Sequence, residues 1–230
     1  MGAAIISGVG GFGTGVILAA LLAPLIGIKA VIPVLAVAGV VINAGRFWFY
    51  RSSLVRPTLV LVLAVSIPFL VLGTWIYSIL DARAIGTVLG IVVILSVPLR
   101  RSLSRRRVAL GRTGLGVGSG VFGLATGLTS GVGVILVSLL LGTGMSGPAV
   151  LATDALVSIV LDACKTALFQ RFSLLDGQTF ATGVVIGAAT IPGSAIAAYL
   201  VNRMHAHLHV LFMEGLILVG GASLLWNSWR

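Results

Sequence analysis

Very few polar or charged residues lie within the long apolar stretches of this chain. Arg46 follows Asn43 by one helical turn, and Lys165 follows Asp162 in the same way. A cation in an apolar setting can hold a small anion, and the planar guanidinium of Arg46 suits the oxygen atoms of an oxyanion. Because Asp162 can pair with Lys165 and reduce its pull on an anion, we expect Arg46 to be the stronger contact. The alternative is that both basic side chains extend to lipid headgroups.

Asp154 is an acidic residue inside an otherwise apolar segment. An ionised carboxylate in the middle of a membrane helix costs about 3 kcal/mol unless it is paired or faces water. We interpret Asp154, together with Asp162, as a coupling site that takes up a proton or as part of a buried structural network. The neutral hydrogen-bond donors closest to this role are Thr129, Ser130 and Thr153.

Glycines cluster at the start of two apolar stretches. Glycine tolerates unwound backbone and close approach, so these clusters can present the free amides of a helix N-terminus to an anion. The alternative is close packing of helices through small residues. The expected substrate contacts are Arg46, Lys165, Asn43, Gly13, Gly15, Thr129, Ser130, Gly131 and Gly133.

The composition requires elements that cross a membrane. The 230 residues are 58% hydrophobic and 9% charged, with a mean hydropathy of +1.18. A bilayer core needs about 20 apolar residues per helix, and the runs show no strand-like alternation. We therefore expect an all-α, multi-pass integral membrane protein, which excludes a soluble enzyme. The expected runs are 3–28, 31–49, 57–80, 84–99, 114–142, 148–170, 178–201 and 208–227.

The net charge of +10 comes mainly from residues at the ends of these runs. Basic residues on short loops mark the cytoplasmic side, so nucleic acid is not expected as a partner. The largest group is Arg100, Arg101, Arg105, Arg106, Arg107 and Arg112.

The chain also resembles itself. Residues 13–22 and 131–140 agree at seven of ten positions, and the Asn43 and Arg46 pair corresponds to Asp162 and Lys165. We expect two homologous halves, 1–100 and 114–230, joined by a basic cytoplasmic linker at 101–113.

The fifth run is too long for a simple membrane helix. It has about 29 residues, and glycines interrupt it as they interrupt the first run. We expect both runs to be broken or re-entrant. Re-entrant runs make the two halves inverted repeats, the arrangement we favour, whereas full crossings make the repeats parallel. Full crossing would also place Arg171 on the cytoplasmic side, as the charge distribution prefers.

Other conspicuous residues have simpler interpretations. Alternating histidines converge on a metal only in an extended segment, so we expect an interfacial loop at His205, His207 and His209 rather than a metal site. Aromatic residues near run ends are expected to anchor the chain at the membrane interface, and they are Trp48, Trp75, Tyr77, Trp226 and Trp229.

Several of these segments together resemble the TauE/SafE-type sulfite exporter family. They are residues 11–15, 43–48, 127–134 and 152–155, and the resemblance spans nearly the whole chain. It implies a small bacterial inner-membrane carrier with two homologous halves. The substrates that it implies are sulfite, sulfonates such as sulfoacetate, and other small organic anions.

The leading hypothesis is therefore a secondary active transporter of small sulfur oxyanions or organosulfonates that works by alternating access. A passive channel or facilitator for another small anion or solute is the first alternative. A membrane enzyme or structural subunit is the second, although no catalytic set of residues is visible. The expected partners are the bilayer and a small anion. No cofactor is expected, and a homodimer is left open.

Overall fold

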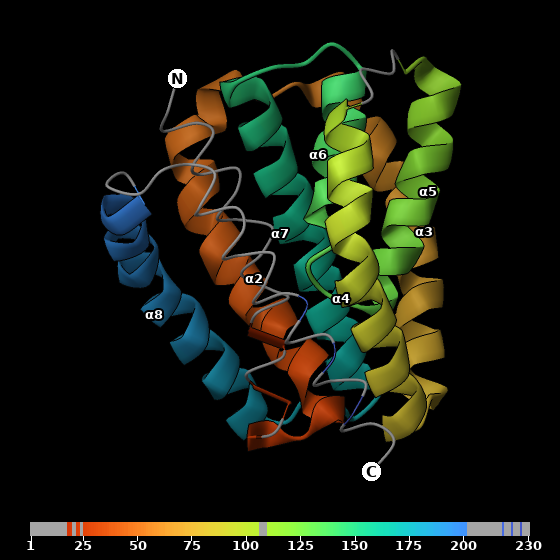
Figure 1. Ribbon diagram of the computed structural model, residues 1–230, viewed down its shortest axis with the longest axis vertical. Coiled ribbons are helices and arrows are strands. Elements are labelled where there is room, and N and C mark those ends of the chain that lie inside the picture. Colours follow the sequence, from red (N-terminus) through yellow and green to blue (C-terminus); the bar gives the residue numbers. More distant parts are fainter. Residues whose placement is uncertain are drawn as a thin grey trace.

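The computed structural model describes residues 18–19, 22–23, 25–105, 110–201, 218, 222 and 226. Within these residues every regular element is helical, as the sequence predicts, and the long helices form one bundle (Figure 1). The elements are α2 (Ile28–Tyr50), η1 (Arg51–Ser53), α3 (Arg56–Ile79), α4 (Ala82–Arg105), α5 (Arg112–Leu128), α6 (Gly133–Gly142), α7 (Pro148–Arg171) and α8 (Gly177–Val201).

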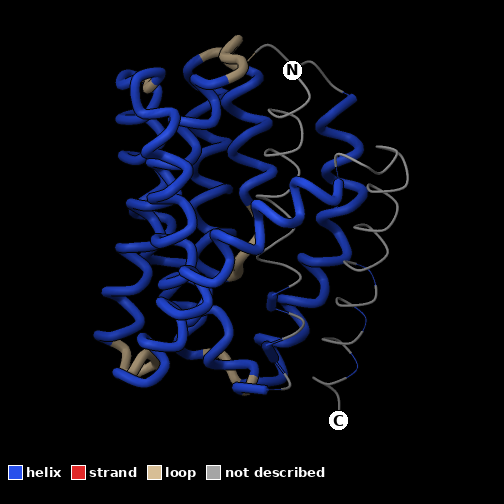
Figure 2. The backbone as a smooth tube through the Cα atoms, turned by 90° about the vertical axis from the view of Figure 1, so that its left-hand side faces the viewer, coloured by secondary structure: helices blue, strands red, loops and turns tan. Residues whose placement is uncertain are grey.

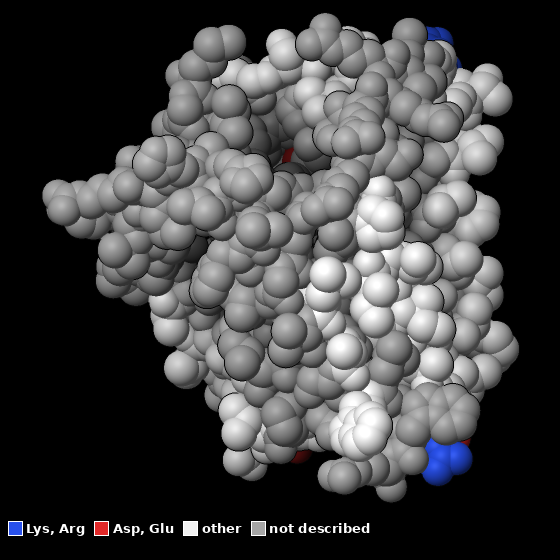
Figure 3. Space-filling view, viewed as in Figure 1, with Lys and Arg blue, Asp and Glu red and all other residues white. Residues whose placement is uncertain are grey.

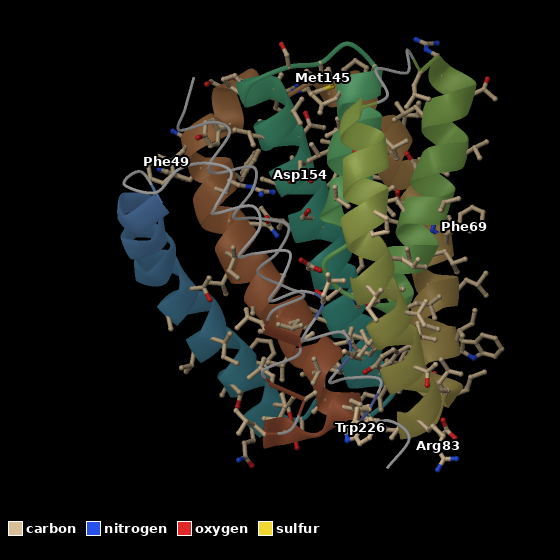
Figure 4. The ribbon with its side chains drawn as sticks, viewed as in Figure 1. Phe49, Phe69, Arg83, Met145, Asp154 and Trp226 are labelled. Carbon is tan, nitrogen blue, oxygen red and sulfur yellow. The ribbon has the colours of Figure 1, made fainter. Side chains whose placement is uncertain are left out.

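The outer surface of the bundle is apolar. Two helical stretches, Ile28–Ser53 and Arg56–Ile79, are long and apolar enough to span a bilayer. Phe49 is 81% exposed, and both Phe49 and Phe69 lie on the flanks of the bundle, whereas Arg83 lies at one end (Figure 4). On the face shown in Figure 3, the described Lys and Arg side chains also lie at the two ends. This distribution is typical of helices that present apolar side chains to lipid.

The helices α2 and α7 run in opposite directions along each other. As the residue number falls from Arg46 to Gly39 on α2, the facing residue rises from Asp154 to Asp162 on α7. In contrast, α8 runs parallel to α2, because Gly183 of α8 meets Val37 of α2 and Gly187 of α8 meets Val41 of α2. The interface of α2 and α7 therefore runs along the two helices, from the middle of α2 to near its end and from near the start of α7 to its middle.

The helices α3 and α5 also run parallel, and they approach closely at small residues. Gly123 faces the backbone of Ser66, and Gly127 faces the backbone of Leu70, so a Cβ at either glycine would collide with α3. The hydroxyl of Ser66 donates to the carbonyl of Ser119 at 2.9 Å. At Gly123 and Gly127, helix packing through small residues is thus the observed use of glycine.

The long fifth run is broken and turns back on itself. Helix α5 ends at Leu128 and α6 begins at Gly133, and the amide of Leu110 donates to the carbonyl of Gly142 at 2.7 Å. The start of α5 and the end of α6 therefore lie at the same end of the bundle. Figure 2 shows loop segments at both ends of the bundle and one within its height, where the chain reverses.

This hairpin corrects the orientation that full crossing would give. Because α5 and α6 together return to the end where they began, α7 starts at the same end of the bundle as the Arg51–Ser53 turn. Arg171, at the far end of α7, then lies at the opposite end (Figure 1). The full-crossing alternative, which placed Arg171 on the same side as the basic group that includes Arg112, is therefore wrong, because it counted the broken run as one crossing.

Tyr77 differs from the predicted interfacial anchor. It is 1% exposed, and its ring packs edge-on against Phe169 with centroids 5.3 Å apart. Its hydroxyl donates to the carbonyl of Lys29 at 3.2 Å, which satisfies the polar end of a buried side chain. Trp48 and Trp75, by contrast, are 65% and 50% exposed, as expected of anchors.

Candidate functional site

The interface between α2 and α7 holds a buried ion pair. The guanidinium Nη2 of Arg46 donates to Oδ2 of Asp154, which lies inside the bundle (Figure 4). The side chain of Asp154 is 1% exposed and that of Arg46 is 16% exposed. The two residues meet because Arg46 is near the end of α2, Asp154 is near the start of α7, and the helices are antiparallel. The pair places opposite charges where an isolated charge would be costly.

This ion pair is incompletely satisfied. Nε of Arg46 and Oδ1 of Asp154 are both buried and have no hydrogen-bond partner among the described residues. A buried guanidinium nitrogen without an acceptor costs free energy, and so does a carboxylate oxygen without a donor. The pair thus retains one free donor for an anion and one free acceptor for a proton.

A second polar contact lies further along the same interface. The carboxylate of Asp162 lies directly against Gly39, at a place where any side chain on α2 would displace it. The side-chain amide of Asn43 donates to the carbonyl of Gly39 at 2.9 Å, within α2. Gly39, Asn43 and Arg46 share one face of α2 by their spacing. The polar residues therefore form a stripe along the helix interface rather than a single cluster.

Lys165 is buried and points toward α5. It is 2% exposed, and its Nζ donates to the carbonyls of Thr126 at 2.5 Å and Thr129 at 2.7 Å. Asp162 lies one turn earlier on α7, but these two hydrogen bonds go to backbone oxygens. Two of the three ammonium donors of Lys165 are therefore committed to the end of α5.

The tip of the hairpin between α5 and α6 is built for a sharp reversal. Gly131 has a φ of 84°, a left-handed conformation that favours glycine. Thr129 is fully buried, and its amide donates to the carbonyl of Ala125 at 2.9 Å, which closes the last turn of α5. After the tip, α6 begins at Gly133 with no side-chain cap. The first amides of any helix have no acceptor within it, so those at Gly133 remain available to a ligand.

The predicted site residues divide between two levels of the bundle. Asp154 and Lys165 are about 11 residues apart on α7, which corresponds to about 16 Å along a helix. Arg46 lies with Asp154, whereas Thr129, Ser130, Gly131 and Gly133 lie with Lys165. At this separation, Arg46 and Lys165 cannot both contact one small anion at the same time. Gly13, Gly15 and the three histidines fall outside the described residues.

Two participants in these contacts were not predicted. Gly39 admits the carboxylate of Asp162, and its place on the same helical face as Asn43 was a signal that could have pointed to it. Thr126 contributes a backbone carbonyl to Lys165, and a backbone atom leaves no signature in the residue type.

Comparison with protein families connects this arrangement to an activity. The model of the family described as sulfite exporter TauE/SafE matches residues 1–224. Comparison with curated proteins and with solved structures gives no match. The family consists of membrane transporters of sulfite-type anions rather than enzymes, in agreement with the apolar helical bundle. Since the match covers nearly the whole sequence, the chain belongs to the TauE/SafE sulfite exporter family.

Proposed function

We propose that this protein is a secondary active transporter of small sulfur oxyanions or organosulfonates in the bacterial inner membrane. The observation that carries the proposal is the buried polar stripe between the antiparallel helices α2 and α7, next to a hairpin broken inside an apolar bundle. Broken helices and buried charges at the interface of two repeats are where secondary transporters bind substrate.

Helix directions support an inverted relationship between the halves. The sequence repeat makes α2 and α7 counterparts, and these two helices run in opposite directions. Helix α2 packs in parallel on α8, the helix that follows α7, and α7 packs in parallel on α3, the helix that follows α2. Gly183 of α8 meets Val37 of α2, and the amide of Val55, just before α3, donates to Thr153 of α7 at 3.5 Å. Such an exchange of neighbours is what an inverted duplication produces, and it suits alternating access.

Within this proposal, Arg46 is the principal anion contact. It carries a buried nitrogen for which the described residues offer no acceptor, and its side chain is more accessible than that of Asp154. Asn43, one turn before it, supplies a neutral amide. Gly13 and Gly15 are the repeat counterparts of Gly131 and Gly133, and we assign to both pairs the amides that approach an anion.

The second level, formed by Lys165 and the tip of the hairpin between α5 and α6, would bind the anion at another stage of transport. The ammonium of Lys165 donates to the carbonyl of Thr129, and the tip residues Ser130, Gly131 and Gly133 follow directly after Thr129 in the chain. Lys165 thus contributes its charge to the tip while also holding the tip in place. We propose that the anion passes between the two levels as the halves rock against each other.

Asp154 would link anion binding to a proton. While Asp154 is ionised, it occupies Arg46 through their ion pair. Protonation of its free oxygen weakens that pair, so Arg46 can turn its charge toward an anion. Anion and proton would then bind together and move in the same direction.

The test is uptake of labelled sulfite, sulfoacetate and a carboxylate control into proteoliposomes preloaded with unlabelled anion. We expect saturable flux of the sulfur anions that internal anion stimulates, and loss of that flux in Arg46→Ala. Arg56→Ala, which removes an exposed basic residue at the start of α3, is the matched control and should keep normal flux. Flux without saturation or stimulation would favour a passive channel. Absence of flux for every anion would overturn the proposal.

A further inference from the structure

The broken end of α5 presents an unusual concentration of oxygen atoms. The last carbonyls of a helix have no partner within it and carry the negative end of the helix dipole. Here two of them, those of Thr126 and Thr129, converge inside the bundle, and Thr129 is fully buried. Without water or a cation these oxygens would be costly in an apolar environment.

The ammonium of Lys165 occupies the position that such oxygens offer to a cation. Its Nζ lies 2.5 Å and 2.7 Å from the two carbonyl oxygens, close to the distances at which hard metal cations contact oxygen ligands. Asp162, one turn earlier on α7, places a carboxylate near enough to attract this ammonium, although the two side chains form no ion pair. In secondary transporters, carbonyls at the ends of broken helices commonly bind Na⁺.

We propose that the position of the Lys165 ammonium is a monovalent-cation site, formed by the carbonyls of Thr126 and Thr129 and balanced in charge by the carboxylate of Asp162, in which a lysine takes the place of a metal ion. The tethered ammonium holds the end of α5 against α7 at any Na⁺ concentration. A short neutral residue at position 165 vacates the site and exposes it to Na⁺. The inference deepens the proposed function, because it says that Na⁺ is not the coupling ion of the natural chain.

The charges around the position agree with a single positive occupant. Asp162 and Asp154 belong to α7, and Arg46 of α2 is already paired with Asp154. The basic residues of α3 and α5, Arg56 and Arg112, stand at the far starts of those helices. One cation at the end of α5 therefore balances one nearby carboxylate, and a divalent ion would leave an excess charge.

Thermal unfolding of the full chain in detergent tests the inference without any transport measurement. Wild type, Lys165→Ser, Lys165→Met and Lys165→Gln are compared in sodium chloride and in choline chloride at equal ionic strength. Serine vacates the site, methionine fills it with an apolar chain, and glutamine offers a hydrogen-bond donor without charge. We expect the Tm of wild type to be the same in both salts. Lys165→Ser should unfold several degrees lower in choline and recover saturably with Na⁺.

Two further results decide between a cation site and an ordinary hydrogen-bonded lysine. Lys165→Met should be destabilised in both salts, and Asp162→Asn added to Lys165→Ser should weaken the response to Na⁺ because it removes the balancing charge. If Lys165→Gln is as stable as wild type, a donor alone suffices and the inference fails. It also fails if Lys165→Ser folds but does not respond to Na⁺, or if Lys165→Met responds equally. Since these readouts need no anion, they are independent of whether sulfite is transported.

Discussion

The guanidinium of Arg46 in α2 is ion-paired with the carboxylate of Asp154 in α7, and each partner keeps one buried polar atom that has no hydrogen bond to the part of the chain that the structure describes. The pair joins the end of one helix to the start of the other. It therefore fixes the antiparallel register in which Asp162 meets Gly39. A contact that sets the register of this interface and still has unused hydrogen-bonding capacity is suited to change its partner during transport.

Removing one member of this pair should destabilise the protein more than removing both. Arg46→Met or Asp154→Leu leaves an unpaired charge in the bundle, and breaking a buried pair in this way costs about 3–5 kcal/mol. The double variant Arg46→Met with Asp154→Leu should regain most of the lost stability but not the anion flux. Thermal unfolding in detergent and uptake into proteoliposomes measure the two effects. Additive loss of stability in the double variant would contradict a direct interaction.

The proton dependence of transport should reside in Asp154. Low external pH protonates Asp154 and frees Arg46, so an inward proton gradient should drive anion uptake in wild type. Asp154→Asn cannot take up the proton and should lose this drive, while exchange of internal for external anion continues because asparagine fits the same space. The measurement is uptake with and without an imposed pH gradient. An unchanged response in Asp154→Asn would remove the coupling role.

The close approach of α3 and α5 predicts unequal effects of alanine at two glycines of the same helix. Gly123→Ala places a Cβ against the backbone of Ser66, which cannot move aside without separating the helices. Among the described residues, no atom lies within 4 Å of such a Cβ at Gly116. Gly116→Ala should be neutral or stabilising by up to about 1 kcal/mol, since alanine favours helix. Gly123→Ala should lower the thermal midpoint, and equal behaviour of the two variants would argue against this packing.

Local sequence features predicted the helical class and the break in the fifth run. Apolar length and the spacing of glycines act within a few turns of helix, so they can be interpreted without knowing the fold. The fifth run indeed reverses at Gly131, where φ is 84°. Tyr77 shows the limit of such reasoning, because its place near the end of a run did not reveal that Phe169 would cover it.

The partners of the charged residues could not be predicted in the same way. The repeat made Arg46 and Lys165 counterparts, and both were expected to contact the substrate, but each contacts a different part of the bundle. Which residue faces Arg46 depends on the direction and register of α2 against α7, and both are set by contacts distant in sequence. Lys165 binds backbone oxygens, which every residue possesses. Charge placement was thus predictable from the sequence, whereas charge pairing was not.

The conformation of the hairpin tip yields a last prediction, which separates strain from function. Gly131 and Gly144 both have a φ of 84°, but Gly131 lies at the half-buried reversal two residues after Thr129, whose carbonyl binds Lys165, and Gly144 lies in the exposed turn after α6. Alanine at either position must adopt a left-handed conformation, which costs about 1–2 kcal/mol. Gly131→Ala and Gly144→Ala should therefore lower stability by similar amounts.

Only Gly131→Ala should also impair anion uptake, because it shifts the amides that precede α6 and the carbonyl of Thr129 that Lys165 holds. Uptake rates are compared after correction for the amount of folded protein in the vesicles. A tip that takes no part in transport would leave the corrected rates of the two variants equal. Loss confined to Gly131→Ala, with its unfolding temperature matched by that of Gly144→Ala, would assign the defect to the tip itself rather than to general destabilisation.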